Sequence, residues 1–160
     1  LETGSPEAAR ATLEQARAMG YEGAERELGR ALLRLRQPAA ARPLLAQAVE
    51  VEPGDGLAQY EYARVLEELG ETEAALAGYR RAVALAPELG DAQWQLGVLA
   101  GRGGAAAEGH YHLGKAHLLR GEYGRALGQF EKAAESLPPG EAKSEVDELL
   151  PRLRAHAERG

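Results

Sequence analysis

The feature that most constrains this chain is a repeat of 34 residues. Small residues recur at the same offsets in three stretches, which run Gly29…Ala41…Ala48…Pro53, Ala63…Ala75…Ala82…Pro87 and Gly114…Ala126…Ala133…Pro138. The first two stretches lie 34 residues apart. A period of roughly 20 to 50 residues is typical of repeat arrays in which each repeat packs only on its neighbours.

Each repeat combines small and bulky residues in a fixed order. The repeats run over 22–55, 56–89 and 107–140, and an irregular stretch at 90–106 separates the last two. The eighth place of each repeat is Gly or Ala, and the twenty-fourth place is bulky: Leu45, Tyr79 and Phe130. Small residues let two antiparallel helices approach closely, and bulky residues fill the space between successive pairs. The pattern therefore predicts stacked pairs of antiparallel helices.

The last copy carries the fullest set of signature residues, which are Leu113, Gly114, Gly121, Tyr123, Ala126, Phe130, Ala133 and Pro138. In this set the chain resembles the tetratricopeptide repeat (TPR) family, with Gly70 and Gly121 at the turn within a repeat. The resemblance covers nearly the whole chain. It implies an all-α fold, a right-handed TPR superhelix (α-solenoid) of antiparallel helix pairs.

We expect one solenoid domain over residues 1–160. Its parts are a half repeat at 1–21, repeats at 22–55 and 56–89, an irregular half repeat at 90–106, a repeat at 107–140 and a C-terminal capping helix at 141–160. The start and stop signals predict helices at 5–19, 22–35, 38–51, 56–69, 72–86, 90–101, 106–120, 122–136 and 141–158. Pro151 is expected to kink the last helix or to start a second one. Because the chain begins in the middle of a repeat and without Met, we expect it to be part of a longer protein.

The repeat phase breaks between 90 and 106. The segments Trp94-Gln95-Leu96-Gly97 and Tyr111-His112-Leu113-Gly114 both carry the signature of a first helix, yet they start 17 residues apart. Two arrangements satisfy this spacing. Either the helix at 106–120 is the second helix of one pair and the first helix of the next, or a deletion tilts the array there. In both cases the glycines at 101–104 form a tight connection, and they lack the spacing of a phosphate-binding loop.

A second resemblance covers the C-terminal part of the chain. The order of the motifs at 91–96, 108–114 and 120–130 is similar to the C-terminal TPR region of BepA-like periplasmic zinc metalloproteases. That resemblance implies a tail that packs on an upstream HExxH domain and presents outer-membrane substrates to it. No HExxH occurs in this chain, which would then be the recognition part of such an enzyme.

Composition excludes several classes of function. The chain has no Cys, which rules out disulfides and thiolate metal sites, and no apolar run long enough to span a bilayer. Its net charge of −6 disfavours nucleic-acid binding, and no concentrated basic face indicates a membrane surface. Arg outnumbers Lys 16 to 3, as in proteins of GC-rich bacteria. Bacterial cytoplasm and periplasm both fit, and any targeting signal would precede Leu1.

We predict no enzyme activity and no metal or cofactor for this chain. Its histidines are His110, His112, His117 and His156, and no HxxxH pair occurs among them. His110 and His117 share a helix face two turns apart, and we interpret all four as exposed or packed helix residues. Glu67 and Glu68 are interpreted as part of a solvated helix end.

The TPR resemblance also implies where a partner binds. In that family the first helix of each pair lines a concave groove, and the corresponding places here hold Arg26, Arg30, Arg34, Tyr60, Arg64, Trp94, Arg102, Tyr111 and Lys115. The three arginines at 26, 30 and 34 recur every fourth residue and are expected to form one basic stripe. Aromatic side chains add flat amphipathic contacts. We therefore expect the groove to bind an acidic peptide or protein segment through Arg–carboxylate pairs, unless Arg is only the default exposed residue of this composition.

Three functions are compatible with these features. The leading one is a non-catalytic scaffold or adaptor that binds a protein partner in its groove. The second is the substrate-recognition tail of a larger metalloprotease. The third is a structural array that self-associates through an exposed end, for which the helix at 5–19, with a partly uncovered Leu13, is the expected surface.

Overall fold

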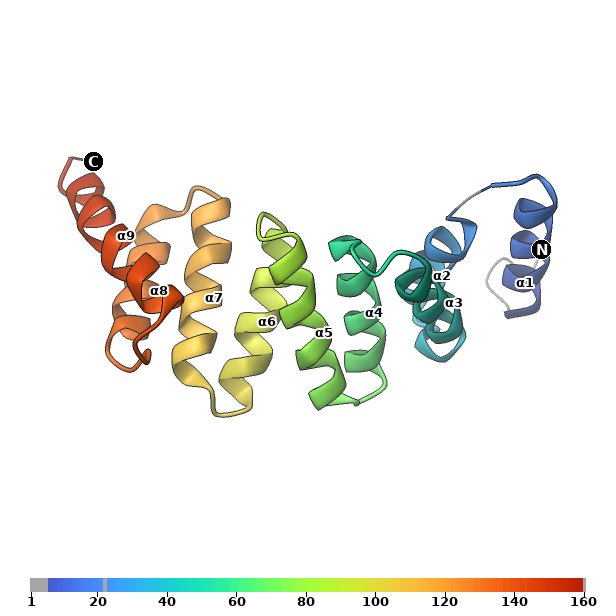
Figure 1. Ribbon diagram of the computed structural model, residues 1–160, viewed down its shortest axis with the longest axis horizontal. Coiled ribbons are helices and arrows are strands. Elements are labelled where there is room, and N and C mark those ends of the chain that lie inside the picture. The colour runs from blue at the N-terminus through green and yellow to red at the C-terminus, as the bar shows by residue number, and fades with distance from the viewer. Residues whose placement is uncertain (1–5, 22, 160) are drawn as a thin grey trace. The chain divides into compact units, whose positions relative to one another are not determined.

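The computed structural model describes residues 6–21 and 23–159, and all regular structure in these ranges is helical (Figure 1). The helices are α1 (Pro6–Ala18), α2 (Ala24–Arg34), α3 (Pro38–Val51), α4 (Gly56–Glu68), α5 (Thr72–Leu85), α6 (Gly90–Arg102), α7 (Ala106–Leu119), α8 (Tyr123–Ala134) and α9 (Glu141–Ala157). Each predicted helix is present, and each bound differs by at most two residues. The predicted helix starts at 5 and 22 lie outside the described residues. The all-α fold of antiparallel helix pairs is confirmed.

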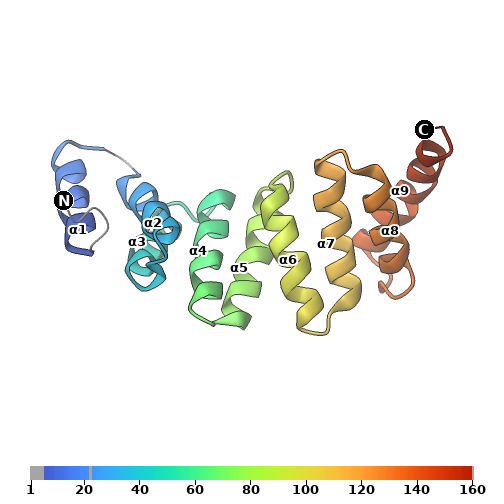
Figure 2. The ribbon, with the colours of Figure 1, turned by 180° about the vertical axis from the view of Figure 1, so that it is seen from behind.

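The chain forms two compact units. Unit 1 ends at Ala86 and contains α1–α5, whereas unit 2 begins at Pro87 and contains α6–α9. In both units each helix contacts the next one along the chain. Figures 1 and 2 show α4 beside α5 in unit 1 and α6 beside α7 in unit 2. None of the helices in the described ranges is both long enough and apolar enough to cross a lipid bilayer.

The core of unit 1 follows the small-and-bulky pattern of the sequence. Leu45, at the twenty-fourth place, is fully buried in a cluster with Leu32, Leu33, Ala41 and Val65. A methyl group added at Gly29, at the eighth place, would lie 2.6 Å from Leu45 Cγ, which is closer than two carbon atoms can pack. The small residue is therefore needed where α2 and α3 meet.

Unit 2 uses the same packing and closes with α9. Phe130 is fully buried, and a methyl group added at Gly114 would lie 2.6 Å from its ring. Val146, Leu150 and Leu153 of α9 are buried in the same cluster as Phe130. Helix α9 thus covers the apolar side of α8, as expected of a capping helix.

Turns of one kind join several of the helices. In the turns that follow α4, α6 and α7, a glycine takes a left-handed backbone conformation, with φ of 80° at Gly70, 91° at Gly104 and 73° at Gly121. The next amide donates to the carbonyl five residues earlier, as in Glu122 N to His117 O at 2.9 Å. This geometry is a common helix C-cap, and glycine adopts it without a Cβ penalty.

Helix α7 belongs to two helix pairs. The same turn precedes it at Gly104 and follows it at Gly121, and it packs on both α6 and α8. Its two packing faces carry different glycines: a methyl group at Gly109 would lie 2.9 Å from the Gly97 carbonyl of α6, and Gly114 meets α8. Of the two arrangements that the sequence allows, the packing is that of a helix shared between two pairs.

One alternative from the sequence is excluded, and one expectation is corrected. Helix α9 continues through Pro151 as a single element, so of the two expected effects of Pro151 the start of a second helix is excluded. Leu13 of α1 is only 8% exposed, not partly uncovered, because α1 packs on α2.

Candidate functional site

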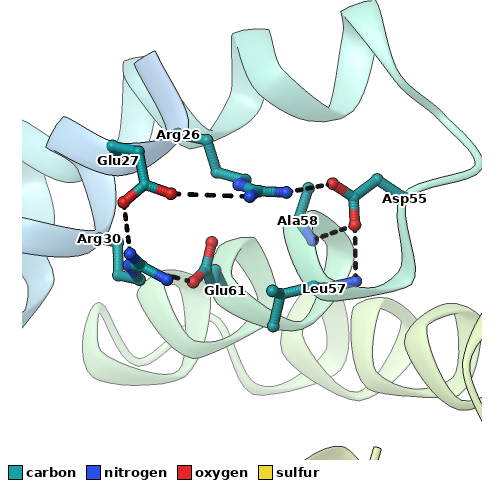
Figure 3. A network of polar contacts seen from close by, with 7 residues as sticks. All are labelled: Arg26, Glu27, Arg30, Asp55, Leu57, Ala58 and Glu61. Atoms are coloured by element: carbon teal, nitrogen blue, oxygen red, sulfur yellow. Dashed lines mark hydrogen bonds and ion pairs between the residues drawn. The ribbon is translucent and has the colours of Figure 1, made fainter. Parts of the chain in front are cut away.

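In unit 1, charged side chains connect α2 with α4 (Figure 3). The Arg26 guanidinium lies 2.5 Å from the Asp55 carboxylate and 3.6 Å from Glu27. Arg30 pairs with Glu27 and lies 3.8 Å from Glu61 of α4. Burial lowers the pKa of Arg26, but the hydrogen bond and charge of Asp55 outweigh this effect and raise it overall. Both arginines are therefore already paired within the chain.

Asp55 is positioned by the start of α4. Its Oδ1 atom accepts hydrogen bonds from the Leu57 amide at 2.9 Å and the Ala58 amide at 3.1 Å, which makes Asp55 the N-cap of α4. The other carboxylate oxygen accepts a hydrogen bond from the Arg26 guanidinium. The Asp55 carboxylate thus caps the start of α4 and also links α4 to α2.

Glu61 is the buried member of this network. Glu61 is 3% exposed, and its Oε2 atom is buried with no hydrogen-bond partner in the described part of the chain. Burial raises the pKa of Glu61, and the nearby charges of Arg30 and Arg26 only partly oppose this. Its charged form is therefore poorly stabilised.

The remaining predicted groove residues of unit 1 are Tyr60, Arg64 and Arg34. Arg64 lies over the Tyr60 ring, 5.9 Å from its centroid, and 4.0 Å from the Glu68 carboxylate. Arg34 is exposed, and within the described residues its side chain makes no ion pair or hydrogen bond. This face of unit 1 therefore offers an aromatic ring and two cations with weak or no partners.

In unit 2, a single carboxylate connects α7 with α9. Glu145 accepts a hydrogen bond from the Tyr111 hydroxyl at 2.5 Å and pairs with the Lys115 ammonium group through its other oxygen. Burial raises the pKa of Glu145, but the hydrogen bonds from Lys115 and Tyr111 outweigh burial and lower it overall. Burial and the bond to Glu145 raise the pKa of the Tyr111 hydroxyl. Two predicted groove residues are thus brought together by an acid that the sequence analysis missed.

Trp94 and Arg102 lie apart from that cluster on α6. The Arg120 guanidinium lies 4.9 Å from the centroid of the Trp94 ring, and the His117 ring meets Trp94 edge-on at 5.5 Å. Arg102 is exposed, with no ion pair or hydrogen bond of its side chain among the residues that the structure describes. Trp94 is therefore partly covered from its own unit, whereas Arg102 is accessible.

The predicted groove is not purely basic, as the sequence analysis expected it to be. Four of its basic residues, Arg26, Arg30, Arg64 and Lys115, have carboxylates within 4.0 Å. The signal that could have revealed this is a recurrent spacing of opposite charges, such as Arg26 to Asp55 and Lys115 to Glu145, a few residues short of one repeat. The stripe at 26, 30 and 34 is a mixed-charge surface, and its role in binding stays a prediction.

The four histidines have different partners. His110 lies 2.8 Å from Gln129, His112 lies 2.7 Å from Gln93, and the buried His117 lies 2.6 Å from Glu122. The His156 ring meets Tyr123 edge-on at 4.6 Å. Within the described ranges, no three His, Asp or Glu side chains are grouped so that they could hold a metal ion.

These features define an all-helical repeat protein in which glycine turns join the two helices of a pair. The sequence profile of the tetratricopeptide repeat matches residues 26–90 and 88–142. The chain therefore belongs to the tetratricopeptide repeat family, as its signature residues predict. Repeats of this kind present extended surfaces for binding other proteins.

Two solved structures share the fold. A crystal structure of MamA is 20% identical over 95% of this chain and 88% of that chain, with a TM-score of 0.66. A structure of MamA from residue 41 to the end, from Desulfovibrio magneticus RS-1, is 21% identical over 76% of this chain and 78% of that chain, with a TM-score of 0.59. Comparison with curated protein sequences finds no match.

Proposed function

We propose that this chain is a non-catalytic protein-interaction module that binds a peptide or protein segment along the first helices of its pairs. One observation carries the proposal. In each unit, partly exposed side chains of a helix reach a helix two places further along the chain: Arg30 reaches Glu61, and Tyr111 reaches Glu145. Within each unit, the outward faces of such helices therefore form a surface that an extended segment can follow.

The chemistry of this surface narrows the acidic partner expected from the sequence. Arg26, Arg30 and Lys115 are held by carboxylates, so the cations available to a partner are Arg34 and Arg64 in unit 1 and Arg102 in unit 2. A partner acid that pairs with Arg64 can place a neighbouring apolar side chain on the Tyr60 ring, because Arg64 lies over that ring. The proposed segment carries acidic and apolar residues but also faces exposed acids of the network.

A comparison of two exposed arginines tests this proposal. The purified chain serves as bait in an extract of the organism that encodes it, and retained proteins are identified by mass spectrometry. Each candidate is then titrated with the chain by calorimetry. Arg34→Glu is expected to weaken binding at least about tenfold, which corresponds to about 1.4 kcal/mol.

Arg81→Glu is the matched control, because Arg81 is an exposed arginine of α5, a second helix. We expect it to bind like the wild type. Equal binding by both variants would show that the binding site does not include the first helices. A chain that retains no protein from the extract would contradict the proposal of a protein-interaction module.

The two alternative roles remain predictions. A metalloprotease tail requires an HExxH domain upstream in the parent gene, which its sequence would reveal. Self-association through the α1 end has one observation in its favour, because Met19 and Tyr21 beside α1 are 85% and 60% exposed. A mass in solution that does not change with concentration, for the wild type and for Tyr21→Ser alike, would exclude it.

A further inference from the structure

A cleft of about 430 Å³ lies in unit 2, and its lining shares no residue with the predicted groove set. The end of α7, the start of α8 and the second half of α9 form it, and its lining is Leu118, Tyr123, Leu149, Arg152, Leu153, Ala155, His156 and Arg159. Helix α8 lies between α7 and α9 in both ribbon views (Figures 1 and 2). The volume of the cleft falls within the range of pockets that hold a few side chains of a ligand.

One wall of the cleft is basic. Arg152 and His156 are four residues apart on α9 and share one face of that helix, and Arg159, just beyond the end of α9, lines the same cleft. Both arginines are exposed, and neither has an ion pair or hydrogen bond through its side chain among the described residues. Among the residues that the structure describes, no Asp or Glu lines the cleft.

Arg154 provides a contrast on the same helix. It lies on the same helix between the two cleft arginines, but it points elsewhere and pairs with Glu131 of α8 at 2.9 Å. Arg26, Arg30, Arg42 and Arg120 likewise have carboxylate partners. Arg152 and Arg159, without partners among the described residues, therefore give this wall a local excess of positive charge in a chain whose net charge is −6.

The floor of the cleft is apolar. Leu153 is buried in the core with Phe130, and Leu118 and Leu149 are partly buried beside it. Tyr123 stands at the edge, 43% exposed, with its ring against His156 at 4.6 Å. An apolar side chain that enters the cleft would contact leucine and tyrosine while it remains next to the guanidinium groups.

We propose that this cleft binds a segment of a partner protein in which acidic residues flank a large apolar one. The apolar side chain contacts Leu118, Leu149 and Leu153, and the carboxylates pair with Arg152 and Arg159. Guanidinium groups recognise carboxylates through two parallel hydrogen bonds, and charge complementarity selects the acidic segment. This surface is separate from the one proposed above and adds a second docking site at the capping end of unit 2.

Three labelled peptides of equal length test the proposal by fluorescence anisotropy. One alternates leucine and glutamate, one alternates leucine and lysine, and one alternates serine and glutamate. The full chain is expected to bind the leucine–glutamate peptide at least about tenfold more tightly than the other two. General electrostatic attraction cannot give this order, because the chain is net acidic.

Variants then locate the binding. Arg152→Gln with Arg159→Gln is expected to weaken binding of the leucine–glutamate peptide at least about tenfold, whereas Arg154→Gln on the same helix leaves it unchanged. Tyr123→Ser weakens it without a change of charge. The loss caused by Arg152→Gln with Arg159→Gln is expected to be the same in an Arg34→Glu background, which separates this cleft from the proposed groove.

Several results would overturn the proposal. Equal loss with Arg154→Gln would show that the peptide senses only the charge of α9. Tighter binding of the leucine–lysine peptide would reverse the chemistry of the cleft. A dimer in sedimentation equilibrium that Arg152→Gln with Arg159→Gln dissociates would make a second copy of this chain the occupant instead.

Discussion

Two carboxylates show how differently the units use the same design. Glu61 in unit 1 and Glu145 in unit 2 both lie between helices that are two places apart in the chain. Glu145 has a hydroxyl on one oxygen and an ammonium group on the other, and its pKa is lowered. Glu61 is more deeply buried, has one oxygen without a partner, and its pKa is raised.

The two carboxylates differ in how many of their hydrogen bonds are formed rather than in the charge around them. Two arginines lie near Glu61, but Glu27 and Asp55 take much of their hydrogen-bonding capacity. A buried carboxylate is stabilised only when hydrogen bonds replace the water that it loses, and proximity to a cation is not enough. Glu145 is therefore expected to stabilise unit 2, whereas Glu61 contributes little or costs stability.

Removing the apolar support behind Glu145 is expected to have the largest effect. Phe130 is fully buried, and its ring lies 6.4 Å from Tyr111, which donates to Glu145. Phe130→Ala is expected to lower the free energy of unfolding by about 3–5 kcal/mol. Fluorescence during urea unfolding measures it, because Trp94 of α6 is the chain's one tryptophan and reports on unit 2.

Leu45→Ala is the corresponding change in unit 1. It should shift the circular dichroism transition with little effect on the Trp94 signal. An equal shift of both signals would show that the units unfold together, and the two carboxylates could then not be compared separately.

Replacing the two acids themselves is expected to give opposite signs. Glu145→Ala leaves the Tyr111 hydroxyl and Lys115 without their acceptor and should cost about 1–2 kcal/mol. Glu61→Met removes a buried charge whose hydrogen bonds are incomplete, and should be neutral or stabilising by up to about 1 kcal/mol. Urea unfolding of both variants measures this, and losses of similar size would remove the contrast between the units.

The glycine turns should behave alike in both units, which provides a reference for the comparison. Gly70→Ala and Gly121→Ala place a Cβ in a left-handed conformation, and each is expected to cost about 1 kcal/mol. Gly128→Ala is the control, because Gly128 is helical with nothing within 4 Å of an added Cβ, so it should stabilise by up to about 1 kcal/mol. Thermal unfolding that showed a cost at only one of the two turns would contradict their equivalence.

The smallest expected effect is on how stability depends on pH, and its direction is opposite for Glu145 and Glu61. The folded-state pKa of Glu145 lies below its unfolded value, so its stabilisation is present at neutral pH and is lost as the pH falls through the folded pKa. The folded-state pKa of Glu61 lies above its unfolded value, so the fold gains stability as the pH falls through that folded pKa towards the ordinary glutamate value.

Urea midpoints between about pH 7 and about pH 4 measure both effects. The deficit of Glu145→Gln relative to the wild type should shrink on acidification. Any advantage of Glu61→Gln should also shrink, as the wild-type residue takes up its proton. An advantage of Glu61→Gln that grew on acidification would contradict the raised pKa.

The sequence predicts the fold more fully than the chemistry of the surface. The helix bounds follow from Gly, Pro and the 34-residue pattern, because these signals act within a few residues or at a constant offset. The partners of Arg26 and Lys115 depend on how far side chains reach between helices that are distant in the sequence. The helix at 106–119 could be predicted only in part. Its glycines at 109 and 114 are visible in the sequence, but only the packing shows that both allow a neighbouring helix to approach closely.

Helix α7 also bears on how such an array changes in length. Deleting residues 90–106 would join Leu89 to Ala107 and leave an uninterrupted series of 34-residue repeats. Because α7 has a glycine on each packing face, we expect it to pack on another helix in place of α6 as its preceding neighbour. A single helix with its turn is therefore the smallest step by which this chain can be lengthened or shortened, in evolution or by design.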